Sequence, residues 1–386
     1  MEIEKKDELD WTHTPQVPYV DQFYTLKRIG SNEEKEAFLE EIIAKGMKPF
    51  YENCCSDFNM ISSLKSIKQM EESNVEKIKK MEIDIEECRQ TMCETDVRDA
   101  ILKKIGFLSQ IGMFEDSINE FKRLSDKTLT LGYRLDIIFH KLRIAFWNYD
   151  HKTLSTLLLK AKEHIDEGGD WDRRNKLKVY QGLFSICKRD FETAANLFLE
   201  TVATFSCSEL LSFKDFIRYC VLSSIISLKR PVLYSKIIRG AEIQQILYYL
   251  TDVKEFVKTF YDCLYDEYFL KLAAIEQSLE VDRYLTNHSQ YYARQMRLLA
   301  YMQLLQSYKS VTLEYMANRF GVTIEYMDRD LYRFISCGKL KCKIDKVNGS
   351  ISTSIPDSKN SKYQEIIKYG DILLQRTQKL CNFINV

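Results

Sequence analysis

The chain has 386 residues with 56 basic and 56 acidic side chains, so its formal net charge at pH 7 is zero. A balanced chain has no long-range field that would attract nucleic acid or an anionic membrane, and either partner would need a local basic patch. The 11 cysteines are scattered without a zinc-site or disulfide-framework spacing, which indicates reduced thiols in the cytoplasm or nucleus. The acidic N-terminus lacks the apolar run of a signal peptide, and no window is apolar enough to span a membrane, so we expect no membrane partner.

Proline scarcity points to a mainly α fold. Only five prolines occur, and none lies in 50–230 or in 232–355. A proline inside a helix costs about 3 kcal/mol, and β folds use proline often in turns, so these long intervals favour helices. We expect residues 1–60 to form an N-terminal arm and the first helices, with the first ~35 residues loosely held.

Residues 61–93 are strongly charged and predict one long helix. Apolar residues recur there at spacings of three and four, in a narrow seam. The seam indicates either a helix docked on its own chain or an intermolecular coiled coil. Its members are Val75, Ile78, Met81, Ile85, Cys88 and Met92.

Residues 94–300 predict a right-handed, tetratricopeptide-like helical solenoid. Three segments, 111–121, 148–158 and 188–198, align as a turn followed by an amphipathic helix, with periods of 37 and 40 residues. Each unit can bury its apolar face only against its neighbours, so the units should stack. Three positions carry the alignment: Phe114, His151 and Phe191; Ile118, Ser155 and Ala195; and Phe121, Leu158 and Phe198.

Aromatic residues are abundant, with 23 tyrosines and 21 phenylalanines. A platform on which nucleic-acid bases stack is one interpretation. Their helical spacing beyond residue 205 favours the other, that most of them pack between helices.

Residues 301–356 predict a winged helix. Thr312 and Thr323 are each suited to cap a helix, and Gly321 provides the tight turn between the two helices. A period-two strand pattern follows in 339–344, a hairpin signal in 347–349, and a return strand in 351–354.

The winged helix raises the question of DNA binding. Its second helix carries Glu325, Asp328 and Asp330 against Arg329 and Arg333, and this negative balance argues against reading the major groove. Lys339, Lys341 and Lys343 of the first wing strand could meet an acidic partner, or could form a solvated strand face. We therefore predict no nucleic-acid partner, and keep these three lysines as a candidate protein interface.

Residues 357–386 predict a terminal helix with a coiled-coil-like apolar stripe. With little chain left to cover it, the stripe favours a partner helix over folding back on the winged helix. The candidate bundle residues are Ile366, Leu373, Leu380 and Ile384.

The segment from Glu167 to Leu183 resembles an active-site loop at first sight, because it gathers glycines, acids and two arginines around a tryptophan. The pattern fits a corner between two helices better: Gly168 and Gly169 end one helix, and Asp170 or Asp172 caps the next. Arg173 and Arg174 should then pair with Asp166, Glu167 or Asp170. Alternatively, they and Trp171 form a docking point for another subunit.

Motifs for catalysis are missing from the sequence. The five histidines are far apart and form no metalloprotease pattern, and no phosphate-binding glycine loop occurs. We expect no enzyme, and assign no catalytic, cofactor-binding or metal-ligating residue.

Helical repeats followed by a winged helix and a terminal helix resemble the PCI family, named for the proteasome lid, the signalosome and eukaryotic translation initiation factor three. The segments R-P-V-L-Y-S-K-I-I-R-G-A-E-I, Y-M-A-N-R-F-G-V and C-K-I-D-K-V-N are similar to those of a PCI subunit of the proteasome lid, and the resemblance spans about residues 95–386. It implies a structural subunit of the lid of the 19S regulatory particle, in ubiquitin-dependent protein degradation. Its partners would be other PCI subunits and the deubiquitylase-bearing subunits, and indirectly the proteasomal ATPases and core particle. The equivalent signalosome subunit and a nucleic-acid-binding PCI adaptor are the alternatives.

Overall fold

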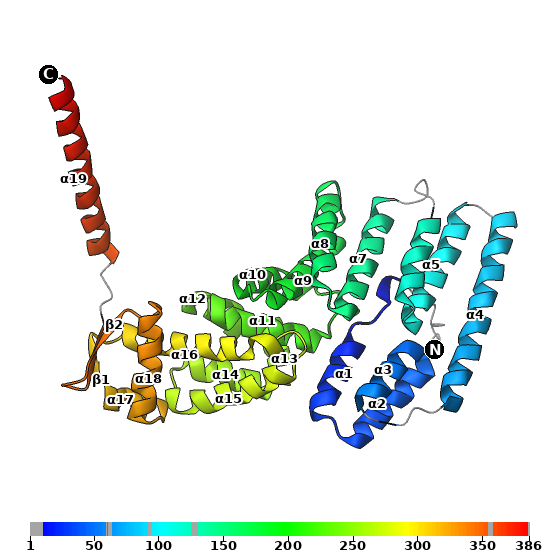
Figure 1. Cartoon of the computed structure of the whole chain (residues 1–386), viewed down its shortest axis with the longest axis horizontal. Helices are drawn as coiled ribbons and strands as arrows, with labels where there is room; N and C mark the ends of the chain where they lie inside the picture. Colours follow the sequence, from blue (N-terminus) through cyan, green and yellow to red (C-terminus); the bar gives the residue numbers. More distant parts are fainter. Residues whose placement is uncertain are drawn as a thin grey trace. The chain divides into compact units, whose positions relative to one another are not determined.

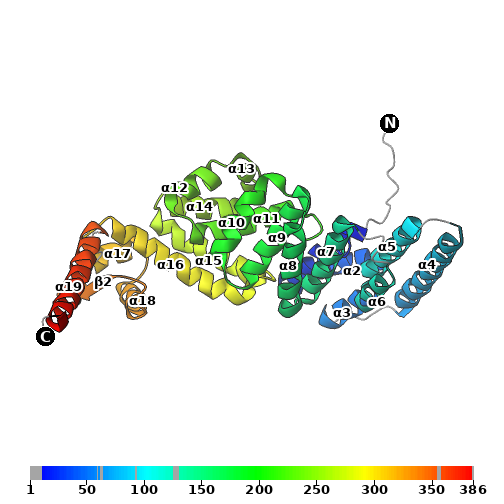
Figure 2. The same ribbon diagram turned by 90° about the horizontal axis from the view of Figure 1, so that it is seen from above.

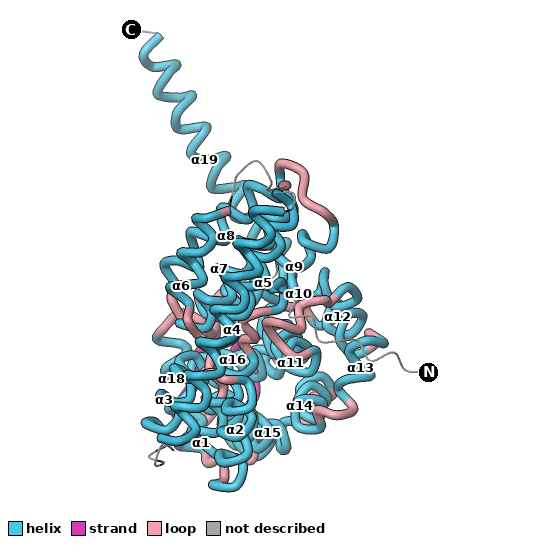
Figure 3. Tube along the Cα trace, turned by 90° about the vertical axis from the view of Figure 1, so that its right-hand side faces the viewer, coloured by secondary structure: helices cyan, strands magenta, loops and turns pink. Residues whose placement is uncertain are grey.

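The computed structural model describes residues 11–58, 60, 64–91, 94–124, 130–353 and 358–384. These residues are mostly helical, with one small sheet (Figures 1 and 3). The chain divides into two compact units, of which the first comprises residues 1–258 and 273–292, and the second residues 259–272 and 293–386. The predicted domain border at residue 300 falls inside α16 (Ser289–Gln306), because one uninterrupted helix crosses that position.

The first unit begins with a 3-10 turn, η1 (Trp11–His13), and three helices, α1 (Pro18–Ile29), α2 (Asn32–Lys45) and α3 (Lys48–Phe58). Ser31 caps α2 in a capping box with Glu34, and Gly46 ends the helix in the left-handed conformation, at a φ of 72°. The expectation of a loosely held arm is wrong for residues 11–17. Trp11 is buried, and Gly106 has no side chain where the Trp11 backbone approaches.

The predicted long helix is α4 (Leu64–Thr91), which packs against α5 (Glu94–Ile111) as its neighbour in Figures 1 and 2. The seam therefore docks on its own chain, with Ile85 buried against α5 residues. Val75 is exposed, and Asn74 takes its place and donates to the Gly46 carbonyl at 2.9 Å. A polar residue can occupy the buried seam where its side chain makes a hydrogen bond to a free backbone group at the end of another helix. Met92 lies outside the described residues.

The repeats appear as helix pairs, in which α6 (Phe114–Glu120), α8 (His151–Asp166) and α10 (Phe191–Thr201) pack on α5, α7 (Leu131–Asn148) and α9 (Trp171–Cys187), respectively. Asp150 and Asp190 cap α8 and α10 through the amides of Lys152 and Thr193. Figure 1 shows α8, α7, α5 and α4 as neighbouring upright helices. Of the aligned positions, the third is buried in all three repeats (Phe121, Leu158 and Phe198).

At the second aligned position only Ala195 is buried, whereas Ile118 is exposed and Ser155 is half-buried. The preceding residue is buried in each repeat: Ser117, Leu154 and Ala194. Both positions lie near the same helix face, because successive residues are only 100° apart, and packing on the neighbouring helix decides between them.

The remaining elements follow without a regular period: η2 (Phe121–Arg123), η4 (Val202–Thr204), α11 (Phe213–Ser227), α12 (Arg230–Leu233), the π-helical η5 (Tyr234–Ile238), α13 (Ala241–Leu247), α14 (Thr251–Tyr261), α15 (Tyr265–Val281) and η6 (Thr286–His288). The end of α14 and the start of α15 belong to the second unit. The aromatic residues of the first unit mostly pack inside: Phe216, Phe256 and Tyr284 are buried, whereas Tyr248 and Tyr249 are exposed. This burial favours the packing interpretation over a base-stacking platform.

The second unit contains the winged helix, built from β1 (Ser310–Thr312), α17 (Leu313–Phe320), α18 (Ile324–Ser336), β2 (Cys342–Asp345) and β3 (Ser350–Thr353). Thr312 and Thr323 cap the two helices as predicted, and Gly321 has a φ of 63°. The antiparallel sheet has the order β1-β3-β2, with Val311 and Ile344 both opposite Ile351. Strand β1 escaped prediction, because three residues are too few to show a period of two. Ser354 lies outside the described residues.

Candidate interaction surfaces

The terminal helix α19 (Ser358–Ile384) is exposed along its described length. Ile366, Leu373, Leu380 and Ile384 are between 61% and 73% exposed. Sequence analysis missed the width of the apolar surface, because it followed only one stripe. Further exposed apolar residues broaden this surface on both sides of the stripe: Ile367, Tyr369, Ile372, Leu374 and Phe383.

At 100° per residue, the apolar positions of α19 cover roughly 220° of the helix circumference. A helix that docks on a single surface needs an apolar arc of ~100°, so the wider arc fits contact with more than one neighbouring helix. Burying a Leu or Ile side chain is worth about 1.5–3 kcal/mol, so even a few of these residues would drive association.

The lysines of the wing lie on the surface. Lys339, Lys341 and Lys343 are exposed, while Leu340 and Cys342 between them are buried, as the alternation predicts. Strand β2 begins only at Cys342, so Lys339 and Lys341 precede the strand.

Helix α18 presents a balanced outer face rather than a negative one. Asp330 is buried and accepts a hydrogen bond from the Tyr301 hydroxyl at 3.0 Å, with Arg297 3.7 Å away. Because Asp330 faces inward, Glu325 and Asp328 remain outside against Arg329 and Arg333. The face still lacks the excess of basic side chains that phosphate contacts require.

The corner between α8 and α9 is a structural junction. Gly168 has a φ of 145°, and Asp170 stands at the N-cap of α9 without a side-chain capping bond, because its carboxylate pairs with Arg173. Arg173 also makes a bidentate contact with Asp136 of α7, at 2.9 and 2.7 Å. This contact raises the pKa of Arg173 above its ordinary value.

The prediction of a pair with Asp170 is thus confirmed for Arg173, and Asp136 was missed. Asp136 and Arg173 are 37 residues apart, which equals the first repeat period. They therefore occupy equivalent positions in neighbouring repeats, and aligning the two repeats would have suggested the contact. Trp171 is 65% exposed and Arg174 is exposed, and a docking point formed by these two residues with Arg173 stays a prediction.

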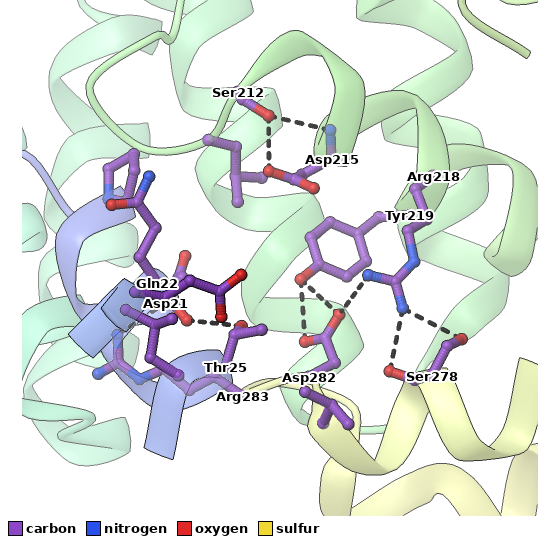
Figure 4. A pocket seen from close by; sticks show the side chains of 15 residues that line it. Asp21, Gln22, Thr25, Ser212, Asp215, Arg218, Tyr219, Ser278, Asp282 and Arg283 are labelled. Carbon is purple, nitrogen blue, oxygen red and sulfur yellow. Dashed lines mark hydrogen bonds and ion pairs between the residues drawn. The ribbon is translucent and has the colours of Figure 1, made fainter. Parts of the chain in front are cut away.

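A cavity of about 570 Å³, lined by both charged and apolar residues, opens in the first unit between residues of α1, α11 and the end of α15. Figure 4 shows Tyr219 and Arg218 converging on Asp282. The Tyr219 hydroxyl donates to the Asp282 carboxylate at 2.8 Å, and Arg218 lies 3.5 Å from it. Sequence analysis missed the cavity, because its walls come from three segments that are distant in the chain.

The described residues meet neither the requirements of a metal site nor those of a membrane-spanning helix. Within those ranges, no group of three or more His, Cys, Asp or Glu side chains is placed to hold a metal ion. No helix among them is long and apolar enough to cross a bilayer.

Comparison with known proteins agrees with this architecture. Residues 64–236 match the family described as 26S proteasome subunit RPN7, and residues 266–354 match the PCI domain. The 26S proteasome non-ATPase regulatory subunit 6 of Caenorhabditis elegans is 40% identical over 361 residues, which cover 92% of this chain and 88% of the relative. Its Arabidopsis thaliana homolog is 39% identical over 352 residues, covering 91% of each. The Arabidopsis thaliana COP9 signalosome complex subunit 1 is more distant, at 22% identity over 294 residues, covering 76% of this chain and 66% of the relative. The chain therefore belongs to the family of the 26S proteasome non-ATPase regulatory subunit 6.

Proposed function

We propose that this chain is a non-catalytic structural subunit of the lid of the proteasome's 19S regulatory particle, where it serves as a scaffold for lid assembly in ubiquitin-dependent protein degradation. The relatives that share about nine-tenths of its length are named as regulatory, non-ATPase subunits of the 26S proteasome. The lower identity to the signalosome subunit makes the signalosome the weaker alternative.

One observation carries the scaffold role: α19 leaves a broad apolar surface uncovered by its own chain. A surface of this kind on one helix is characteristic of a protein–protein contact. We propose that helices of other lid subunits cover it, and that the winged helix, with Lys339, Lys341 and Lys343, contacts neighbouring PCI subunits. The proteasomal ATPases and core particle are then indirect partners. We propose that the chain acts in the cytoplasm and nucleus.

The test places charge on opposite faces of α19. In Leu373→Asp/Leu380→Asp, two aspartates enter the apolar arc, and in the matched control Gln364→Asp/Gln375→Asp, the same two charges enter the polar face. Each tagged chain is expressed in cells, and co-purifying proteins are measured by quantitative mass spectrometry.

We expect the apolar-face variant to recover proteasome lid subunits at least about tenfold less well than the control, because each buried carboxylate costs several kcal/mol in an apolar contact. Circular dichroism of both purified variants verifies that the repeats remain folded. Equal recovery of lid subunits by the two variants would exclude α19 as the assembly surface. Recovery of signalosome subunits without proteasomal ATPases would instead support the alternative complex.

A further inference from the structure

The N-terminal segment 11–29 is held against the first unit by interactions at several separate places. Buried Arg143 of α7 donates to the backbone carbonyls of Thr14 and Trp11, at 2.9 and 3.3 Å. The Val17 amide donates to the carbonyl of Glu209 at 3.1 Å. Helix α1 itself contains no fully buried residue, and its apolar side chains Tyr19, Val20, Phe23 and Leu26 pack only partly buried against the apolar cluster of α2 and α3. Such a segment can separate from its seat at a lower cost than a core helix.

The last attachment consists of hydrogen bonds to the Asp21 side chain and lies at the cavity described above. Arg283 is 3.2 Å from the Asp21 carboxylate of α1, and the Tyr284 hydroxyl donates to the same carboxylate at 3.4 Å. Arg283 also donates to the carbonyls of Phe146 and Trp147 at the end of α7, both at 2.8 Å. One guanidinium thus joins α1, α7 and the chain that follows α15, and it is shared rather than dedicated to Asp21.

The cavity contains more acids than bases. Four carboxylates line it, those of Asp21, Glu34, Asp215 and Asp282, against the two guanidiniums of Arg218 and Arg283. With all six groups ionised, the lining carries two negative charges in excess, and Asp282 is only 3% exposed. An ionised Asp21 therefore enters a site that already holds a buried carboxylate.

We propose that helix α1 forms a releasable strap, and that the charge state of Asp21 controls its release. Closing the strap places Asp21 beside Arg283 and the Asp282 carboxylate. A neutral Asp21 enters this site without adding to its excess negative charge. An ionised Asp21 adds to it, and favours the open strap.

The titration behaviour of the cluster agrees with the geometry. Partial burial raises the pKa of Asp21, whose side chain is 25% exposed, from 3.8 to about 7, and nearly complete burial raises the pKa of Asp282. A carboxyl group whose pKa is higher in the closed than in the open state stabilises the closed state at low pH, and this stabilisation is lost as the pH rises towards 7. The ionisable groups around Asp21 are Tyr24 and Arg28 on α1, Glu34 on α2, Asp215, Arg218 and Tyr219 on α11, Cys187 at the end of α9, and Asp282, Arg283 and Tyr284 after α15.

Hydrogen exchange of the full-length chain, followed by mass spectrometry at pH 6, 7 and 8, tests the proposal. Protection factors, corrected for the intrinsic pH dependence of exchange, are compared for amides of α1. With a pKa of about 7 when closed and 3.8 when open, the opening equilibrium constant is about tenfold larger at pH 8 than at pH 6. The protection of α1 is therefore expected to fall about tenfold across this range.

Two variants assign the effect. Asp21→Asn mimics the neutral carboxyl group, and should keep the pH 6 protection of α1 up to pH 8. Asp116→Asn removes an exposed acid on α6, and should behave as the unmodified chain. Constant α1 protection in the unmodified chain, or a tenfold fall that persists in Asp21→Asn, would overturn the proposal. If Asp21→Asn fails to fold, the unmodified chain decides alone, by whether its α1 protection falls about tenfold or stays constant.

Discussion

Single residues set how closely the repeat helices approach. Gly182 of α9 faces Phe198 of α10, and a Cβ atom added there would lie 2.4 Å from Phe198 Cε1. Phe198 is fully buried, so its ring has no free space into which to move. The small residue therefore determines the spacing of α9 and α10.

Gly182→Ala should consequently destabilise the first unit by about 1–3 kcal/mol, the usual cost of forcing an extra carbon into a packed core. Gly370→Ala on α19 is the matched control, since nothing lies within 4 Å of its added Cβ. The control should stabilise helix α19 by up to about 1 kcal/mol, because alanine favours a helix more than glycine does. Urea denaturation of both variants measures the change in unfolding free energy, and a neutral Gly182→Ala would contradict the close approach.

Local chemistry made many residues predictable. The hydroxyls of Thr312 and Thr323 accept hydrogen bonds from amides three residues later, and Gly321 adopts the left-handed conformation of its own turn. A short window of sequence is therefore enough to predict these features. The pairing of Asp21 with Arg283 spans 262 residues and depends on how every intervening helix packs. No periodicity in the sequence encodes such a contact.

At the scale of elements, α4 shows how a narrow seam docks on its own chain. Ile85 is 6% exposed and packs with Ile101, Leu102 and Ile105 of α5, whereas Ile83, two residues earlier, is 55% exposed. The charged remainder of the helix faces water, which explains why its seam resembles a coiled coil.

The two isoleucines provide an internal comparison. Ile85→Ala should lower the unfolding free energy by about 2–4 kcal/mol, through lost burial and a new cavity. Ile83→Ala should change it by less than about 0.5 kcal/mol. Thermal and chemical denaturation at two protein concentrations measure both variants. Similar effects at the two positions, or a loss that depends on concentration, would support the intermolecular coiled coil instead.

Elements were predictable where their own periodicity is strong. The bounds of α4 and α19 fall close to the predicted helices, and the buried alternation around Leu340 and Cys342 follows the expected pattern. Sequence could not show that α1 is held in place, because its apolar side chains are only partly buried and its polar contacts with Arg283 and Tyr284 reach across the chain. It also could not choose between Ile118 and Ser117, which the neighbouring helices decide.

At the scale of the whole molecule, buried ionisable groups make stability depend on pH. His140 is fully buried, with Nε2 2.8 Å from the Ser109 hydroxyl and Nδ1 3.4 Å from Arg143. Burial, reinforced by the nearby Arg143 charge, holds the pKa of His140 well below its ordinary value of 6.5. The folded chain therefore keeps this ring neutral while the unfolded chain protonates it, and the stability that results is lost as the pH falls below 6.5.

Comparison with His140→Asn isolates this effect from other titrating groups. Between pH 7.5 and 5.5, the unmodified chain should lose about 1.4 kcal/mol of stability relative to the variant, because only its unfolded state gains a histidine proton. Urea denaturation measures the difference in unfolding free energy between the unmodified chain and His140→Asn, once at pH 7.5 and once at pH 5.5. The same difference at both pH values would show that His140 does not titrate in this way. Asp21 has the opposite sign, so the strap and the repeat core should respond to acid in opposite directions.

The uncovered helix α19 has a consequence for how much of this subunit a cell can hold. On the proposed function, an assembled copy hides its apolar arc, while a surplus copy keeps it in water. The two populations thus differ in surface chemistry without any covalent mark, and unassembled copies should associate or be captured by chaperones in proportion to their excess. The same side chains that bring the subunit into its complex would then limit how many orphan copies a cell tolerates, and so couple its abundance to that of its partners.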